Sequence, residues 1–164
     1  MMFVEAKRSF KKSKSYLLNI IKEPGNLSYY HPFCKRNDAI KWPGPNSIDE
    51  LEYLNGLTLE RNFFNWHENG YDLIIGRKNK SKMAQVNWLI EGNDEISSLR
   101  VRINPEIRHY TPFKNKFMQN LSWYLFVRPM LKRYIDNVIK GFEYFVITET
   151  EVKPNQFGKH AWFS

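Results

Sequence analysis

The sequence predicts one α+β domain in which a curved antiparallel sheet wraps around a long C-terminal helix. Three observations lead to this prediction. The chain has 164 residues, 42% of them apolar, which suits a single domain with a substantial core. The stretch 39–103 alternates between apolar and polar residues with a period of two. Apolar residues in 113–145 recur at helical spacing over much more than an ordinary helix length.

The N-terminal part is expected to form a strand at 3–10 followed by two short helical segments. The first helical segment, 13–21, has apolar residues on one side and ends before Pro24-Gly25. The second, 26–34, is interrupted by Pro32. Together they would connect the first strand to the rest of the sheet.

Six further strands are expected in the period-two region, separated by turn-forming residues. Short breaks connect antiparallel neighbours, so seven strands in all should form a meander. Asn55-Gly56 is the strongest hairpin signal. A two-residue loop there would place Glu52 opposite Leu59 and on the same face as Arg61. The expected strands are 39–42, 49–54, 57–66, 71–77, 83–91 and 98–104.

The alternation leaves one apolar sheet face, which the C-terminal helix should cover. Pro129 should kink or split this helix near 126–128, because proline lacks an amide donor. The domain is expected to span 1–148, and the ring-rich tail 149–164 to dock back onto it. The apolar helix positions are Phe113, Phe117, Leu121, Tyr124, Leu125, Leu131, Ile135, Val138, Phe142 and Phe145.

Several classes of protein and site are excluded by residue usage. The lone Cys34 rules out an internal disulfide and a Cys-rich zinc site. The four histidines lack the paired spacing of metal ligands, and no nucleophile elbow, phosphate-binding loop or dinucleotide fingerprint occurs. We therefore expect no metal and no cofactor. The absence of a transmembrane segment or signal peptide in the sequence favours a cytoplasmic location.

The net charge of +8 is unevenly distributed. Residues 100–140 hold nine Lys/Arg against two acids. Such a basic surface could favour weak contact with an anionic partner, or could simply keep the protein soluble. There is no strong nucleic-acid signal, because the rings interleaved with basic residues at 128–134 have helical spacing and should belong to the core. The basic residues of the anionic-surface alternative are Arg100, Arg102, Arg108, Lys114 and Lys116.

The expected order of elements is one strand, two short helices, six antiparallel strands and a long helix. The stretches that carry a resemblance are 31–34, 53–57, 61–66, 70–77, 138–142 and 155–164. In these features the chain resembles the helix-grip fold of the START-related (SRPBCC) superfamily, over nearly its whole length, and within it a bacterial subgroup. This superfamily includes birch-pollen-type allergens, START lipid-transfer domains and polyketide cyclases or dehydratases. The resemblance implies a hydrophobic cavity between sheet and helix that receives a lipid, polyketide or sterol-like ligand.

The leading hypothesis is therefore a binding or carrier protein for a small hydrophobic ligand. It requires a cavity of at least about 300 Å³. Arg61 and Glu52 could orient an anionic or hydroxylated head group, or could instead form a cross-strand ion pair in solvent. The expected ligand contacts are Arg61, Trp66, Tyr71, Trp88, Glu52 and His31.

Two alternatives remain open. The first is an enzyme of the cyclase or dehydratase kind, with His31, Asp72 or Glu52 as acid–base groups. It requires a titratable side chain in the pocket, whereas His31 could also be a structural histidine at a turn and Asp72 an exposed strand residue. The second is a protein that binds an anionic surface, membrane or nucleic acid, through the basic residues named above.

Overall fold

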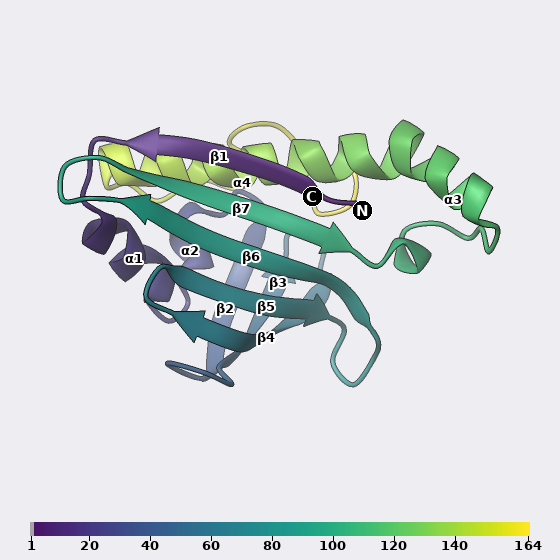
Figure 1. Cartoon of the computed structure of the whole chain (residues 1–164), viewed down its shortest axis with the longest axis horizontal. Coiled ribbons are helices and arrows are strands. Elements are labelled where there is room, and N and C mark those ends of the chain that lie inside the picture. The colour runs from purple at the N-terminus through teal and green to yellow at the C-terminus, as the bar shows by residue number, and fades with distance from the viewer. Residues whose placement is uncertain (1) are drawn as a thin grey trace.

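The computed structural model describes residues 2–164 and confirms the α+β class. Seven strands form one sheet in the order β1-β7-β6-β5-β4-β3-β2, and all neighbours are antiparallel. Figure 1 shows the sheet curving from β1, which runs beside the long C-terminal helix, to β2 and β3. The strands are β1 Val4–Phe10, β2 Cys34–Lys41, β3 Ile48–Tyr53, β4 Thr58–His67, β5 Gly70–Gly76, β6 Lys82–Gly92 and β7 Ser97–Pro105.

The helices fall into two groups. Helices α1 (Lys14–Lys22) and α2 (Leu27–Tyr30) follow β1 as expected. The Ser13 hydroxyl caps α1 by accepting a hydrogen bond from the Tyr16 N–H (3.1 Å). After β7 come the short 3₁₀ helix η1 (Ile107–His109), helix α3 (Lys116–Ser122), the π-helical turn η2 (Trp123–Val127) and helix α4 (Arg128–Thr148).

Strand β2 begins five residues earlier than the sequence predicts, and α2 is correspondingly short. The segment Cys34–Asp38 was expected to belong partly to the second helical segment, but it pairs with β3. Most of β2 is exposed, since it is the edge strand of the sheet. It therefore carries no period-two signal, and only its backbone pairing with β3 makes it a strand.

The β3–β4 hairpin has a different register from the predicted one. The Tyr53 N–H donates to the Leu57 carbonyl (2.8 Å) and the Gly56 N–H to the Tyr53 carbonyl (2.9 Å), which closes a three-residue loop. Gly56 occupies the left-handed region (φ +85°) that this loop requires. Because a slip of one residue exchanges the two faces of a strand, the expectation that Glu52 and Arg61 share a face is wrong.

Helix α4 covers the apolar face of the sheet, as predicted. Its buried face includes Leu131, Ile135, Val138 and Phe142. Gly141 permits α2 to approach closely, since a Cβ there would lie 2.0 Å from the Tyr30 carbonyl oxygen. Strands β6 and β7 bury their apolar residues in alternation, as their sequences predict.

The first part of the C-terminal helix does not cover the sheet, contrary to expectation. Segments α3, η2 and α4 have 7, 5 and 21 residues, a length of about 50 Å at the α-helical rise. The longest strand, β6, has 11 residues, or about 37 Å. In Figure 1, α3 accordingly extends past the end of β7. The helix is interrupted just before Pro129, where the prediction placed a kink, and the interruption is the π-helical turn η2.

The segment Glu149–Ser164 runs back along the domain. The Val152 N–H donates to the Tyr29 carbonyl (2.9 Å) and the Asn155 N–H to the Pro32 carbonyl (2.8 Å). Farther along, the side chains of His160 and Phe163 are buried. This segment therefore contributes to the interior as well as to the surface.

Candidate ligand-binding site

A cavity lies between the inner face of the sheet and α4. Its volume is about 70 Å³. The walls are mainly aliphatic side chains from β3 to β7 and from α4. This volume is well below the roughly 300 Å³ of an ordinary ligand pocket, so the expectation of a preformed cavity of that size is wrong. The lining residues with polar or aromatic groups include His31, Tyr53, Arg61, Trp88, Tyr110 and Tyr134.

A chain of hydrogen bonds joins three of the lining residues. The Nε2 atom of His31 lies 2.9 Å from the Tyr134 hydroxyl, which lies 3.0 Å from the Tyr53 hydroxyl. The Phe33 N–H donates to Nδ1 of His31 (3.2 Å), so Nδ1 carries the lone pair and Nε2 carries the hydrogen. His31 therefore donates to Tyr134. The backbone N–H of Phe33 thus fixes the direction of the hydrogen bond from His31 to Tyr134.

All three members of this chain are held uncharged near neutral pH. Burial, together with the Arg61 charge, lowers the pKa of His31 to about 3. Burial, together with the neighbouring Tyr134, raises the pKa of Tyr53 well above its ordinary value, and burial raises that of Tyr134 as well. Near pH 7 the chain is therefore a neutral donor–acceptor system.

Arg61 reaches the cavity wall but is already paired. Its Nε donates to Asp49 Oδ1 (2.7 Å) and its Nη2 to Asp49 Oδ2, a bidentate ion pair between directly opposed residues of β3 and β4. Both side chains are buried, at 4% and 0% exposure. Although burial tends to lower the pKa of Arg61, the charge and hydrogen bonds of Asp49 outweigh this effect and raise the pKa, so Arg61 stays charged.

The three aromatic residues predicted to contact the ligand lie in two different parts of the domain. Trp88 lines the cavity, whereas Trp66 and Tyr71 do not. Trp66 packs edge-on against Trp42 (ring centroids 5.1 Å apart) and beside Tyr71 (5.5 Å), next to the β4–β5 turn. The Tyr71 hydroxyl is buried without a hydrogen-bond partner among the described residues. Burial has the largest effect on the pKa of Tyr71 and raises it, although the charge of Arg61 tends to lower it.

Glu52 and Asp72 lie on the outer face of the sheet. Glu52 accepts a hydrogen bond from Lys35 (2.6 Å) and pairs with Arg36 (3.5 Å), and the hydrogen bond from Lys35 lowers its pKa. Asp72 accepts hydrogen bonds from the side-chain amides of Asn87 (2.6 Å) and Asn65 (2.7 Å). Neither carboxylate lines the cavity. Of the predicted site residues, the cavity thus gathers His31, Arg61 and Trp88.

Sequence reasoning missed the tail residue at the end of the cavity and the hydroxyl groups beside it. Phe163 lines the cavity and stacks on Tyr53 (4.5 Å), with Tyr134 also close (4.6 Å). His160 stacks on Phe163 (5.1 Å), and its Nε2 lies 3.0 Å from the Met130 carbonyl of α4. Tyr134 could have been found, because it lies between the buried helix positions Leu131 and Val138. Nothing local to the sequence indicated that Phe163 would meet it.

Residues 2–164 contain neither a cluster of metal-ligating side chains nor a membrane-spanning helix. In this range no three or more His, Cys, Asp or Glu side chains gather in an arrangement that could hold a metal ion. None of the helices in the described part of the chain is long and apolar enough to cross a membrane.

Solved structures share this architecture, although sequence comparison alone finds nothing. No protein-family model matches the chain, and no curated protein sequence does. A START superfamily protein from Mycobacterium smegmatis superposes with a TM-score of 0.61 at 13% identity, over 92% of this chain and all of that one. TTHA0849 from Thermus thermophilus gives 0.67 at 13% identity, over 90% and 98%. DynU16, from the dynemicin biosynthetic locus, gives 0.64 at 10% identity, over 92% of this chain and 49% of that one.

These similarities show that the chain has the START-related helix-grip fold that the element order predicts. All three identities are low, so the likeness concerns the fold and not a particular ligand or reaction.

Proposed function

We propose that this protein binds a small, mainly apolar ligand in the cavity between the sheet and α4. The observation that carries the proposal is the cavity's composition: an aliphatic wall with one neutral hydrogen-bonding chain, His31–Tyr134–Tyr53, exposed to it. A few convergent polar groups in an otherwise apolar cavity are typical of sites for small ligands. The structural neighbours belong to a fold whose members include proteins that bind hydrophobic ligands, which supports the same class.

The hydrogen bonds of the chain indicate which polar group the ligand carries. Tyr53 and Tyr134 together have two hydroxyl hydrogens, and the bond between them uses one. The other has no partner among the described residues, and both tyrosines line the cavity. A ligand with an acceptor oxygen, such as a ketone or ester carbonyl, would take it.

The charges argue against an anionic ligand. Asp49 already satisfies Arg61 with two hydrogen bonds, and His31 is neutral. An added carboxylate would lose hydration and gain no unpaired cation in return. We therefore expect a neutral ligand, which replaces the anionic head group considered at first.

The small cavity volume requires a movement to admit such a ligand. Phe163 lines the cavity and contacts the rings of Tyr53 and Tyr134. It belongs to the segment Glu149–Ser164, which is joined to the domain by hydrogen bonds and ring contacts. Displacement of this ring would enlarge the cavity without moving the sheet. Phe163→Ala should do the same permanently.

The test uses prodan, a neutral naphthalene ketone whose fluorescence shifts to the blue in apolar surroundings. We expect Phe163→Ala to bind prodan at least about tenfold more tightly than the unchanged protein, since less aromatic surface must be displaced. The double variant Tyr53→Phe/Tyr134→Phe should lose about tenfold, because it lacks both hydroxyl donors. Tyr144→Phe, on α4 beside Phe157 and outside the cavity wall, is the matched control and should change nothing.

Two results would contradict the proposal. One is the absence of a prodan shift in both the unchanged protein and Phe163→Ala while thermal unfolding shows both to be folded. The other is equal binding by the hydroxyl variant, which would remove the assigned polar contact. Independently of these results, native mass spectrometry of gently purified protein, followed by denaturing analysis of released molecules, would identify the class of the natural ligand.

A second candidate function, a cyclase or dehydratase, is favoured by one observation: the cavity holds a titratable histidine hydrogen-bonded to a tyrosine. His31 could act as a base through Nε2 only in its other neutral tautomer, in which the hydrogen moves from Nε2 to Nδ1 and would then face the Phe33 N–H. Its lowered pKa also opposes proton uptake. Turnover of a polyketone substrate that is lost in His31→Gln would establish this alternative.

A further inference from the structure

The projecting end of the C-terminal helix, with the residues just before it, carries several large apolar side chains that are 41–70% exposed. Phe117 is 70% exposed, Tyr124 and Phe126 are each 65% exposed and Leu125 is 58% exposed. Side chains of this size are usually buried when they gather on one helix, and large exposed apolar patches mark interaction sites. We call this set the projecting face; it consists of Phe113, Phe117, Leu121, Tyr124, Leu125 and Phe126.

The face is surrounded by positive charge alone. From residue 107 to residue 135 the sequence contains six Lys or Arg and no Asp or Glu. Lys114, Lys116 and Arg128 flank the rings, and all three side chains are exposed. The acids on either side of this range pair with Arg108 and Lys132, and with none of these three cations. A partner that complements this surface therefore offers both apolar and anionic groups.

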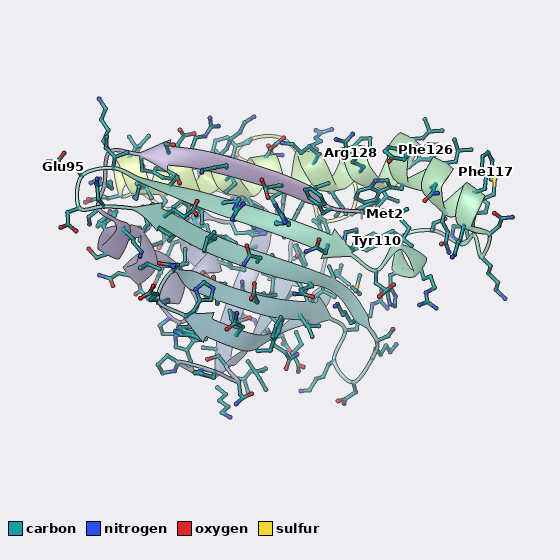
Figure 2. The ribbon with its side chains drawn as sticks, in the orientation of Figure 1. Met2, Glu95, Tyr110, Phe117, Phe126 and Arg128 are labelled. Atoms are coloured by element: carbon teal, nitrogen blue, oxygen red, sulfur yellow. The ribbon has the colours of Figure 1, made fainter. Side chains whose placement is uncertain are left out.

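The geometry places the face where it can reach a flat partner. Figure 2 shows Phe117 and Phe126 on the end of the helix that extends beyond the sheet, and Arg128, the first residue of α4, follows Phe126 by two positions. The π-helical turn η2 buries Trp123 and Val127, which anchor this end, while the intervening residues Tyr124, Leu125 and Phe126 point to solvent. The anchoring residues allow the exposed rings to be presented on a rigid helix.

We propose that the projecting face docks this protein onto an anionic lipid bilayer, with its rings and leucines in the interfacial layer and its Lys and Arg at the head groups. Aromatic and leucine side chains next to basic residues are the composition that binds membrane interfaces. Each basic residue near an anionic surface strengthens binding about fivefold. A second copy of this chain fits the face poorly, because it would bring two sets of like charges together.

Ring contacts also link the cavity to the segment that leads into the projecting helix. Tyr110, which precedes α3, lines the cavity and packs on Trp162 (5.7 Å) of the segment that carries Phe163. Phe163 is thus connected through Trp162 to Tyr110, in the segment that leads into α3, by two ring contacts. Docking itself does not depend on the proposed ligand, and it is measured with lipid alone.

The experiment is flotation of the purified full chain with vesicles of phosphatidylcholine alone or with about 30% phosphatidylserine, at about 25 mM and about 300 mM salt. We expect binding to the anionic vesicles only, at least about tenfold weaker at the higher salt. Phe117→Ser/Phe126→Ser should weaken it at least about tenfold, and Lys114→Glu/Lys116→Glu at least about twentyfold.

The controls carry the same changes elsewhere on the surface. Phe64→Ser/Ile147→Ser removes two side chains that are 48% and 70% exposed on β4 and on the far end of α4. Lys78→Glu/Lys80→Glu reverses two exposed charges in the β5–β6 loop. The apolar control should bind as the unchanged protein does, and the charge control should lose much less than the Lys114/Lys116 variant.

Four results would overturn the proposal. The first is no flotation of the unchanged protein at low salt. The second is equal flotation of Phe117→Ser/Phe126→Ser, since the face would then not enter the lipid. The third is a dimer in solution that this variant abolishes without changing flotation, which would assign the face to a second copy. The fourth is binding to single-stranded RNA, but not to vesicles, that the same variant removes.

Discussion

The two ends of the C-terminal helix carry the same kind of sequence and have opposite surroundings. In α4, Phe142 is fully buried and packs edge-on against Tyr30 (5.0 Å) and Phe10 (5.6 Å). In α3, Phe117 is 70% exposed and faces solvent. Helical periodicity identified both residues as members of one apolar face. The comparison teaches that periodicity locates an apolar face but does not say what covers it.

The first prediction tests this comparison directly and has the largest expected effect. Phe142→Ala should lower the free energy of unfolding by about 3–5 kcal/mol, because it leaves a cavity in the core. Phe117→Ala should change it by less than about 0.5 kcal/mol, because the ring contributes little to folding. Urea unfolding followed by fluorescence measures both. Comparable losses in the two variants would mean that α3 packs against the domain in solution.

The second prediction extends the comparison to ion pairs. Arg61→Met should cost about 3–5 kcal/mol of stability, because it leaves the buried carboxylate of Asp49 without a partner. Arg36→Met, on the exposed Glu52 pair, should have little effect. The double variant Asp49→Leu/Arg61→Met should recover most of the loss, since both charges leave the core together. If Arg61→Met and Arg36→Met unfold at the same urea concentration, the Asp49–Arg61 pair is not buried as described.

The third prediction concerns histidines and has the smallest effect. Well above pH 6.5, the ordinary pKa of histidine, His31 is neutral in both the folded and the unfolded state and adds no pH dependence. Below that value the unfolded chain takes up a proton, whereas the folded protein resists protonation down to its pKa of about 3. The free energy of unfolding should therefore fall by about 2 kcal/mol between pH 6.5 and pH 5 on account of His31.

In His31→Gln the free energy of unfolding should fall by about 2 kcal/mol less over this pH range than in the unchanged protein. Some slope should remain, because burial also lowers the pKa of His160. His109→Gln, which removes an exposed histidine, is the matched control variant. An unaltered slope in His31→Gln would show that His31 is accessible to protons in the folded state.

Much of the fold could be predicted because the relevant signals are local. Alternation identified six of the seven strands closely, and the spacing around Val138 and Phe142 identified the covering helix. Strand β2 was largely missed because an exposed edge strand has no apolar alternation. The short loop at Gly56 was recognised, but its length was not, since Asn-Gly suits loops of two or three residues.

The site was predicted less well, because a single register error moved its charged residues. With a two-residue loop, Glu52 and Arg61 would face the cavity together. With the observed three-residue loop, Arg61 pairs with Asp49 on the inner face of the sheet and Glu52 pairs with Lys35 on the outer face. His31 and Trp88 were placed near the cavity on the basis of the fold order, and the structure has both in its wall. Tyr134 and Phe163 come from segments distant in sequence from β3, so no local pattern joined them to Tyr53.

The sequence by itself determined the order of elements, the apolar face of the sheet and of α4, and the concentration of positive charge around α3. These follow from side-chain periodicity and composition, which do not depend on distant contacts. Only the tertiary structure decided the β3–β4 register, the direction of hydrogen bonding from His31 to Tyr134, the position of Phe163 in the cavity and the exposure of Phe117. The reason is that each depends on which groups meet across the fold, and strands of the same pattern can be paired in more than one register at nearly the same local cost.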